Sequence, residues 1–281
     1  MGETRSGAAG NSPGPGEDGT AMVMQERKAY ILHQLEERSS VTVAELSSAL
    51  GLSEVSVRKL LMAMEQEGKL KRTWGGAVCA HGSLREFSHQ EKATVHLEEK
   101  KAIARAAYDC IADGEAVFLD CGTTTIQLAR LIIAGPKRRI LVCTNAINIA
   151  AALSAAPDIQ TIVIGGELRG SILSCVGSLA ELSLQRLFFD KGFISGNHFT
   201  LEHGFSTPIF QEAELKRRVL SVSKEKFVLM DYSKYGDDSL VQVVPSQGVD
   251  TLITDWHAPD ELARGFEEKG VRVIRGAGGG I

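Results

Sequence analysis

The chain of 281 residues lacks any uninterrupted apolar run of about 18 residues, so we expect no membrane-spanning helix and no membrane partner. It also lacks a C-x-x-C pair, because its cysteines are few and widely spaced: Cys79, Cys110, Cys121, Cys143 and Cys175. An odd, unpatterned set of cysteines is typical of reduced thiols. The sequence therefore predicts a cytoplasmic protein without a disulfide framework.

Signatures of secretion, nucleotide binding and metal binding are missing as well. Residues 1–22 are polar and rich in Gly, Pro and Ser, so they predict a disordered tail rather than a signal peptide. No G-x-G-x-x-G follows a predicted strand, and no Walker lysine follows the turn at Gly122, which disfavours a nucleotide site. His81, His89 and His96 lie among charges without the spacing of metal ligands, so we interpret them as solvated. We expect no metal and no cofactor.

A net charge of −4 does not favour a nucleic-acid partner, but the charge is unevenly distributed. Five cations and two anions fall between residues 58 and 72: Arg58, Lys59, Lys69, Lys71 and Arg72, with Glu65 and Glu67. DNA binding requires only a local basic face, so the bulk charge does not exclude it.

Residues 23–80 predict a small domain of helices. Apolar residues recur at helical spacing within 25–38, and Thr42 with Glu45 has the spacing of a capping box at the start of a second helix. Gly51 ends that helix and allows a sharp turn into a third one. Two short helices around a tight turn are typical of a helix-turn-helix.

The third helix is expected over residues 54–67 with Ser53 as its cap, and residues 69–78 predict a two-stranded basic wing. Small polar and basic side chains near the start of such a helix reach phosphates and base edges in the major groove. The residues available for its core are Val55, Val57, Leu61 and Met64. A winged helix-turn-helix is favoured over a generic three-helix bundle, which the pattern alone leaves open. The candidate DNA contacts are Thr42, Ser53, Glu54, Ser56, Val57, Arg58, Lys59, Lys69, Lys71 and Arg72.

Beyond a linker predicted at residues 81–98, residues 99–276 predict an α/β domain. Apolar strands alternate with helical segments, and the expected strands are 116–120, 139–143, 160–166, 191–196, 226–231, 250–255 and 271–274. Strands that are apolar throughout indicate a parallel sheet covered by helices on both faces.

Small polar residues follow three of these strands, where ligands of parallel sheets bind. The turn from Gly122 to Thr125 combines close backbone approach with hydroxyl groups and a helix N-terminus, which suits a phosphate. Ordinary helix capping is an equally good reading of that turn alone. Further residues at such ends are Thr144, Asn145, Gly165 and Gly166. Three such ends together favour a ligand site.

The remaining polar segments are less specific. We expect residues 201–208 to form a polar loop, and the spacing of Glu212 and Lys216 by itself favours a surface ion pair of small energy. Lys234 follows a strand, where it either holds an anionic ligand or is solvated.

Taken together, the ordered motifs resemble the DeoR family of bacterial transcriptional regulators, in its sugar-catabolism branch. The resemblance spans residues 25–274 and rests on SEVSVRKLLMAMEQEGKLKRTWGGAV, FLDCGTTTIQLA, VCTNAINIA, IVIGGELR, VGSLAE, FDKGFISGN, LEHGFSTP, EAELKR, VLMDYSKYG and DTLITD. It implies an effector domain similar to the ribose-5-phosphate isomerase fold and a repressor that a phosphorylated sugar releases from DNA. It also implies that Glu212 and Lys216 line a pocket.

The resemblance carries a set of effector-binding residues onto this chain. They are Asp120, Gly122, Thr123, Thr124, Thr125, Thr144, Asn145, Gly165, Gly166, Asn197, Glu212, Lys216 and Lys234. Two positions depart from the family pattern. Leu60 replaces a carboxylate beside Arg58 and Lys59, and His198 replaces a glycine, where a ring would narrow the pocket or change the sugar accepted.

Two functions remain as hypotheses, and a third reading keeps the DNA binding but makes the effector response weak or the protein an activator. The first is a repressor of a carbohydrate-utilisation operon that binds a double-stranded DNA operator as a homodimer or homotetramer. The second is an enzyme similar to a sugar-phosphate isomerase with an accessory helical domain. Asn197 weighs against the enzyme, because it places an amide where proton transfer would need an acid.

Overall fold

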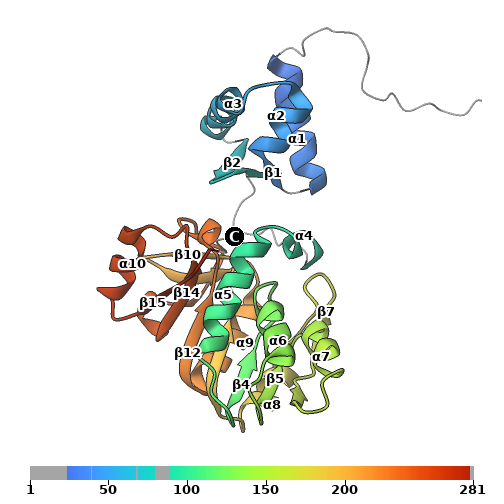
Figure 1. Cartoon of the computed structure of the whole chain (residues 1–281), viewed down its shortest axis with the longest axis vertical. Coiled ribbons are helices and arrows are strands. Elements are labelled where there is room, and N and C mark those ends of the chain that lie inside the picture. The colour runs from blue at the N-terminus through green and yellow to red at the C-terminus, as the bar shows by residue number, and fades with distance from the viewer. Residues whose placement is uncertain (1–23, 39, 68, 80–88, 279–281) are drawn as a thin grey trace, which may run out of the picture. The chain divides into compact units, whose positions relative to one another are not determined.

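The protein is described from a computed structural model, which covers residues 24–38, 40–67, 69–79 and 89–278 (Figure 1). The chain divides into two compact units, residues 1–79 and 80–281, and each is described by itself. The predicted tail over residues 1–22 lies outside the described residues. Within the described part of the chain, no helix has both the length and the apolar character needed to cross a bilayer.

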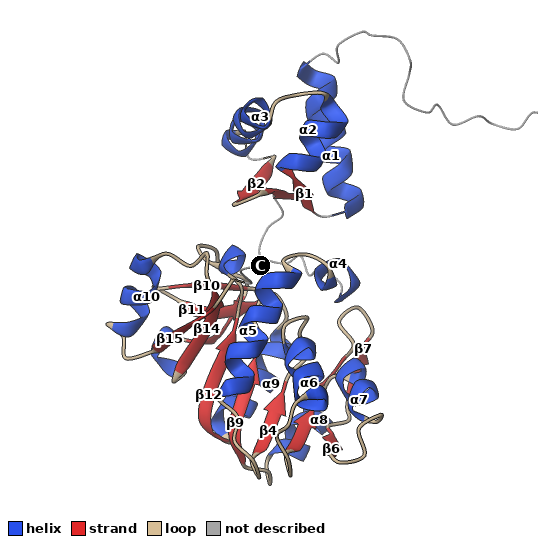
Figure 2. Cartoon of the chain, in the orientation of Figure 1, coloured by secondary structure: helices blue, strands red, loops and turns tan. Residues whose placement is uncertain are grey.

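The N-terminal unit contains the three predicted helices and a three-stranded antiparallel sheet (Figure 2). Its elements are α1 (Met24–Arg38), β1 (Ser40–Thr42), α2 (Val43–Leu50), α3 (Glu54–Gln66), β2 (Leu70–Thr73) and β3 (Gly76–Cys79). The strand β1 was not predicted, and it pairs with β3 of the wing. It forms because Thr42 must be extended, at φ −96° and ψ 154°, to cap α2.

The predicted caps of the helix-turn-helix are confirmed. The hydroxyl of Thr42 accepts from the Glu45 N–H at 3.1 Å, and the Glu45 carboxylate accepts from the Thr42 N–H at 2.9 Å. Gly51 ends α2 at φ +62°, a left-handed conformation that favours glycine. Ser53 caps α3 by accepting from the Ser56 N–H at 3.2 Å. The turn between the two helices is therefore specified by local chemistry.

The buried face of α3 differs from the prediction at two residues. Val55 is 60% exposed, whereas Leu60 is 6% exposed and packs in the core with Val57, Leu61 and Met64. These four residues follow the i, i+3, i+4, i+7 spacing of one helix face. Leu60 is therefore a core residue, and its departure from the family pattern concerns packing.

The C-terminal unit is built on a seven-stranded parallel sheet of order β15-β14-β12-β9-β4-β5-β6. Its strands are β4 (Ala116–Leu119), β5 (Leu141–Thr144), β6 (Gln160–Val163), β9 (Phe189–Ile194), β12 (Ser223–Leu229), β14 (Thr251–Asp255) and β15 (Arg272–Gly276). Each of them overlaps a predicted strand, so the parallel α/β sheet is confirmed.

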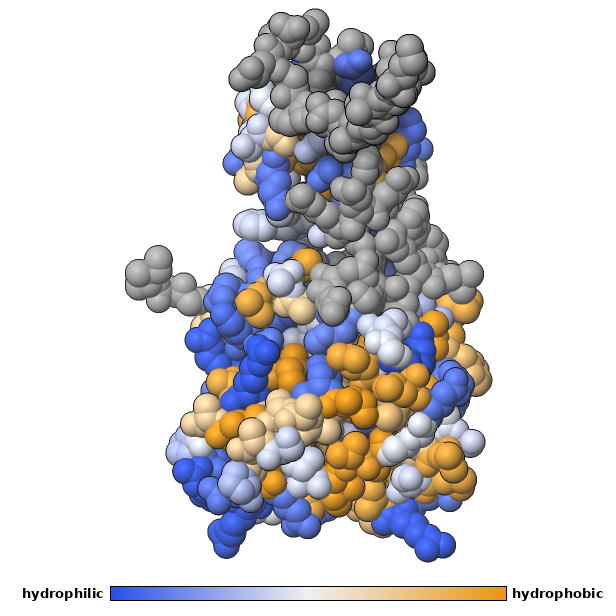
Figure 3. All heavy atoms as spheres, turned by 90° about the vertical axis from the view of Figure 1, so that its right-hand side faces the viewer, coloured by the Kyte–Doolittle hydropathy of each residue, from blue (hydrophilic) through white to orange (hydrophobic). Residues whose placement is uncertain are grey.

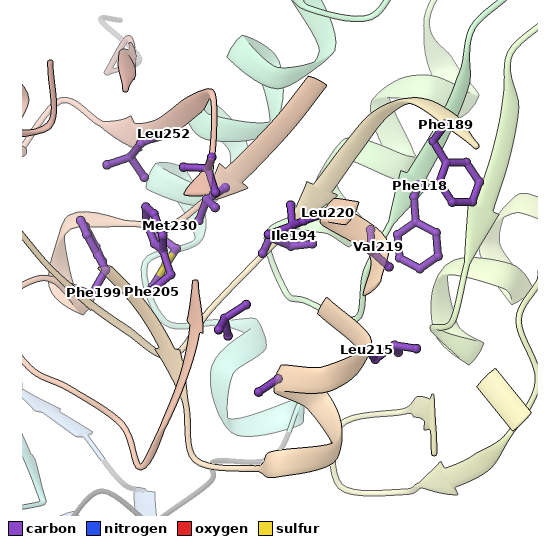
Figure 4. Close-up of a cluster of buried hydrophobic side chains, with 14 of the residues drawn as sticks. Phe118, Phe189, Ile194, Phe199, Phe205, Leu215, Val219, Leu220, Met230 and Leu252 are labelled. Carbon is purple, nitrogen blue, oxygen red and sulfur yellow. The ribbon is translucent and has the colours of Figure 1, made fainter. Parts of the chain in front are cut away.

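Helices cover both faces of this sheet. On one face lie α5 (Leu97–Asp109), α6 (Thr125–Ala134) and α7 (Ile147–Leu153), and on the other lie α8 (Ser178–Leu184), α9 (Phe210–Ser221) and α10 (Asp260–Glu267). Each face of the sheet has its own hydrophobic core, and successive residues of a strand point to opposite faces. Val117 thus packs with α5 and α6, while Phe118 packs with α8 and α9. Figure 4 shows Phe118 beside Phe189 in the second of these clusters.

Two small antiparallel sheets were not predicted. One is the hairpin of β7 (Glu167–Arg169) and β8 (Ser174–Val176), and the other contains β10 (His198–Thr200), β11 (Gly204–Thr207) and β13 (Val241–Val244). The remaining elements are α4 (His89–Ala93), η1 (Tyr232–Lys234) and η2 (Ser246–Gly248).

The expectation of a polar loop over residues 201–208 is wrong for most of its length. Gly204 turns the chain at φ +77°, and β11 then packs with every residue buried. A Cβ at Gly204 would lie 2.4 Å from the Val244 carbonyl oxygen, so only glycine fits there. The stacked rings of Phe199 and Phe205 supply apolar contact to this strand. Because most other residues of 201–208 are polar, the sequence did not indicate that contact.

Candidate functional site

The first candidate site is the exposed face of α3 with the wing. Ser53, Glu54, Ser56, Arg58 and Lys59 are exposed along the first turns of the helix. Val57 is fully buried, so its side chain supports the helix from inside and is withdrawn as a contact. Thr42 is partly committed too, because its hydroxyl caps α2.

Acidic partners hold several of the cations. Glu54 binds Arg58 at 2.7 Å, Glu67 binds Lys69 at 2.8 Å, and a Glu65 carboxylate oxygen lies 3.8 Å from Arg72 Nε. Such exposed pairs contribute about 0–1 kcal/mol, so phosphates can replace the carboxylates at small cost. The pairs orient the cations and leave the face available to an anion.

Two exposed apolar side chains on this unit were missed by sequence reasoning. Val55 lies on α3 among the polar candidates, and Trp74 is 77% exposed at the turn between β2 and β3. An aromatic ring at the tip of a basic hairpin was visible in the sequence as Thr73-Trp74-Gly75, but the wing was interpreted from its cations alone.

The second candidate site is a pocket in the C-terminal unit, beyond the carboxyl ends of β4, β9 and β12. The predicted residues that line it are Gly122, Thr123, Thr124, Asn197, Glu212, Lys216 and Lys234. The other lining residues are His89, Lys92, Cys121, Ile172, Ser195, Gly196 and Leu229. A smaller cavity next to it is lined by Asp120 and Asn145 together with Glu212 and Lys216.

Four predicted ligand residues do not line either cavity. Thr125 is fully buried and its hydroxyl donates to the Asp120 carbonyl at 2.8 Å, whereas Thr144 is fully buried and accepts from the Ala146 N–H at 3.0 Å. Gly165 and Gly166 follow β6 and are not among the lining residues, and a Cβ at Gly166 would lie 2.5 Å from the Val176 carbonyl oxygen. These residues shape turns and strand packing, so we withdraw them as ligand contacts.

The turn after β4 lines the pocket with Gly122, Thr123 and Thr124. A Cβ at Gly122 would lie 2.4 Å from Ser195 Oγ and 2.9 Å from Thr125 Oγ1. Among the described residues, no protein acceptor is found for the N–H groups of Thr123 and Thr124, which precede α6. Backbone donors at a helix N-terminus attract an anion. The turn therefore has the geometry of an anion cradle.

Lys216 and Asp120 form a buried ion pair beneath that turn, with side chains 5% and 3% exposed. The Asp120 carboxylate also accepts from the Ser195 N–H at 3.0 Å. Burial opposes the charged ammonium, but the charge of Asp120 outweighs it and the pKa of Lys216 is raised. Lys216 therefore stays cationic and fixes the loop after β9.

A second ion pair joins Glu212 to Arg169 of β7, and the Thr207 hydroxyl donates to Glu212 at 3.3 Å. Glu212 and Lys216 are thus both buried and bind separate partners. The interpretation of this i, i+4 pair as a surface ion pair is wrong, and the pocket lining that the family resemblance implied is the observed arrangement. Spacing alone did not distinguish them, because both arrangements use one helix face.

The charge of the pocket lining indicates the kind of ligand that it suits. Burial raises the pKa of the Cys121 thiol to about 12, so the sulfur is not a thiolate nucleophile at neutral pH. Three lysines and one carboxylate line the pocket, and the lining is therefore positive overall. Such a lining suits an anionic ligand.

Two histidines differ from expectation. His89 is half-buried, lines the pocket and lies 2.9 Å from the Asn148 side-chain nitrogen, so its interpretation as a solvated linker residue is wrong. His198 lies in β10 with Nδ1 2.8 Å from Ser239 Oγ, and it is not among the lining residues, so it does not narrow the pocket as expected.

Lys100 of α5 makes stability depend on pH. Its buried ammonium donates to the carbonyl oxygens of Lys92 and Val95. Burial, with Lys234 and Lys92 adding to it and Asp231 opposing it, lowers the pKa of Lys100 from 10.5 to about 8. Between these two values the unfolded chain binds more protons, so this group makes the fold more stable as pH rises.

We expect Lys100→Met to remove that pH dependence. Between about pH 8 and 10, the free energy of unfolding of the parent protein should rise with pH relative to the variant by up to about 1.4 kcal/mol per pH unit. Urea unfolding of both proteins across this range measures the difference, in which other titrating groups cancel. Parallel pH profiles would show that Lys100 is protonated equally in both states.

Comparison with known proteins finds matches for both units of the chain. Residues 27–82 match the model of the DeoR-like helix-turn-helix domain, and residues 95–256 match that of the DeoR C terminal sensor domain. The chain is 35% identical to the putative aga operon transcriptional repressor of Escherichia coli O157:H7, over 89% of this chain and 93% of that protein. It is 34% identical to the regulator GlpR of Haloferax volcanii, over 91% and 99%.

A further relative is the lactose phosphotransferase system repressor of Lactococcus lactis, 31% identical over 83% of this chain and 92% of that protein. Among solved structures, a D-ribose-5-phosphate isomerase in complex with phospho-erythronic acid aligns at a TM-score of 0.37 and 15% identity, covering 49% of this chain and 53% of that one.

Proposed function

The chain belongs to the DeoR family of transcriptional regulators, and on that premise we propose that it represses a carbohydrate-utilisation operon and is released from DNA by a phosphorylated sugar. It is a DNA-binding regulator and not an enzyme. Two relatives are named as repressors, of the aga operon and of the lactose phosphotransferase system, and they support repression as the mode of action.

One observation carries the choice of ligand. The pocket joins the Gly122 turn, whose backbone donors suit a phosphate, to the cations Lys92 and Lys234. Asn197 and Glu212 also line it and supply the amide and carboxylate oxygens that bind sugar hydroxyls. Phosphate and polyol groups are thus both provided for in one pocket.

Recognition of DNA is proposed for the exposed face of α3. Lys59, Lys69, Lys71 and Arg72 would hold phosphates, while Ser53, Ser56 and Arg58 would approach base edges and Val55 a thymine methyl group. Glu54 would orient Arg58, since they are already paired. The effector must bind the DNA-competent and DNA-incompetent states with different affinity, or it would shift nothing.

We propose that the protein acts as a homodimer or homotetramer, because one helix-turn-helix reads only half of a two-fold operator. Figure 3 shows apolar side chains gathered on one face of the C-terminal unit. Exposed large apolar residues of this unit include Leu168, Leu179, Leu182 and Phe188. Apolar patches of this kind support self-association.

The proposal is tested by fluorescence anisotropy with the DNA upstream of the protein's own gene. We expect salt-sensitive, sequence-preferring binding that one member of a panel of pentose and hexose phosphates reverses. The same member should raise the melting temperature, because a ligand of the native state stabilises it. Unphosphorylated sugars serve as controls. Equal release by the phosphorylated and free sugars would contradict a phosphate-binding pocket.

Gly122→Ala is expected to weaken binding of the active sugar phosphate by about 10- to 100-fold, since a Cβ 2.4 Å from Ser195 Oγ displaces the turn. Isothermal titration calorimetry measures the change. The matched control is Gly165→Ala, because a Cβ at Gly165 meets no atom within 4 Å and should leave the affinity unchanged. If both variants bind as the parent does, the Gly122 turn is not the phosphate site.

A further inference from the structure

The helix α4 connects the pocket to the segment that leads to the DNA-binding unit. Only residues 80–88 separate Cys79, at the end of the N-terminal unit, from His89. His89 and Lys92 of α4 both line the pocket, together with Lys216 and Lys234. The wall of the effector site is therefore partly made of residues that sequence reasoning assigned to a linker.

Contacts from three other elements hold α4 in place. The His89 N–H donates to the Ser171 carbonyl at 2.7 Å, and the His89 ring meets Asn148 of α7. At the other end of α4, the buried ammonium of Lys100 binds the carbonyl oxygens of Lys92 and Val95. His96 completes the turn into α5 at φ +53°, a conformation that favours glycine. This turn is thus kept by tertiary contacts against a local preference.

Several cations gather beside α4, and the Asp231 carboxylate lies near Lys100 and Lys234. Lys92 and Lys234 share the pocket lining. Burial lowers the pKa of His89, and the positive charges of Lys92, Lys100 and Arg130 lower it further. An anion above the Gly122 turn would attract Lys92 and Lys234, and it would do so more strongly in a site with little water. Because Lys92 belongs to α4, that attraction would act on the helix.

We propose that α4 supplies His89 and Lys92 as effector ligands, so that anion binding tightens α4 against the rest of the C-terminal unit. The inference rests on the proposed function, because it takes the pocket to be the effector site. Coupling between the DNA and effector sites requires an element with two arrangements whose equilibrium both sites influence. In this proposal α4 is that element.

Hydrogen exchange of the full-length protein, with inorganic phosphate against chloride at equal ionic strength, tests the proposal. We expect phosphate to slow exchange by about tenfold in two peptides, one over residues 121–131 and one over residues 89–100. Slowing in the first peptide alone would overturn the role of α4 and leave the phosphate site standing. Slowing in neither would overturn both the phosphate site and the inference.

Substitutions of Lys92 make the test specific. In Lys92→Met, phosphate should no longer slow exchange over residues 89–100, and Lys92→Arg should restore the effect because it keeps the cation. Lys101→Met is the matched control, since Lys101 lies on α5, pairs with Glu98 and does not line the pocket. Melting curves without phosphate identify variants that fail to fold. Identical behaviour of Lys92→Met and Lys101→Met in folded protein would overturn the proposal.

Discussion

Asp120→Ala is expected to lower the free energy of unfolding of the C-terminal unit by about 3–5 kcal/mol, because it leaves the buried Lys216 ammonium without its counter-charge. The loss also removes the acceptor for the Ser195 N–H. Urea unfolding followed by Trp256 fluorescence measures the change. All variants are made in a chain that carries Trp74→Phe. The chain has two tryptophans and Trp74 belongs to the other unit, so the remaining fluorescence reports on the C-terminal unit alone.

A double variant that removes both charges separates the ion pair from general damage to the pocket. Removing both charges in Asp120→Asn/Lys216→Met should cost about 2 kcal/mol less than Asp120→Ala, because no unpaired charge then remains buried. The amide introduced by Asp120→Asn keeps an oxygen that can accept from the Ser195 N–H. If the double variant is as unstable as Asp120→Ala, the unpaired charge of Lys216 is not the source of the cost.

Arg58→Ala/Lys59→Ala is expected to weaken binding to operator DNA by about 100- to 1000-fold, from one base-reading contact and one phosphate contact on α3. The slope of log affinity against log salt should also fall by about one to two. Fluorescence anisotropy across a salt series measures both quantities. Both residues are exposed, so the melting temperature should be unchanged.

The control for this variant removes the same charge elsewhere. Lys101→Ala/Arg105→Ala takes two cations from α5 of the C-terminal unit and should change operator affinity little. Equal losses in the two variants would show that net charge, and not the position on α3, governs binding. A loss for Arg58→Ala/Lys59→Ala that is the same on unrelated DNA would assign both residues to phosphate contact alone.

Much of the fold was predictable, because its signals are local. The capping box of Thr42, the left-handed turn at Gly51 and the cap at Ser53 depend on residues within one helical turn of each other. The strands of the parallel sheet were predictable as well, since both of their faces are buried and their sequences are apolar throughout.

One error occurred where burial depends on residues distant in sequence. Residues 204–207 contain polar side chains and were predicted as loop, yet they form a buried strand between β10 and β13. On α3, Val55 and Leu60 are both apolar and nearly one and a half turns apart. This second error was local, because Leu60 shares the i, i+3, i+4, i+7 spacing of Val57, Leu61 and Met64 and Val55 does not.

By itself, the sequence determined the class of the protein: a winged helix-turn-helix, a parallel α/β domain, and a turn at Gly122 suited to an anion. The tertiary structure decided which charges meet, because it brings Asp120 to Lys216 across 96 positions of sequence and Arg169 to Glu212 across 43. It also placed His89 in the pocket wall rather than in solvent. A charged side chain has no local pattern that names its partner, so its role follows from the fold that surrounds it.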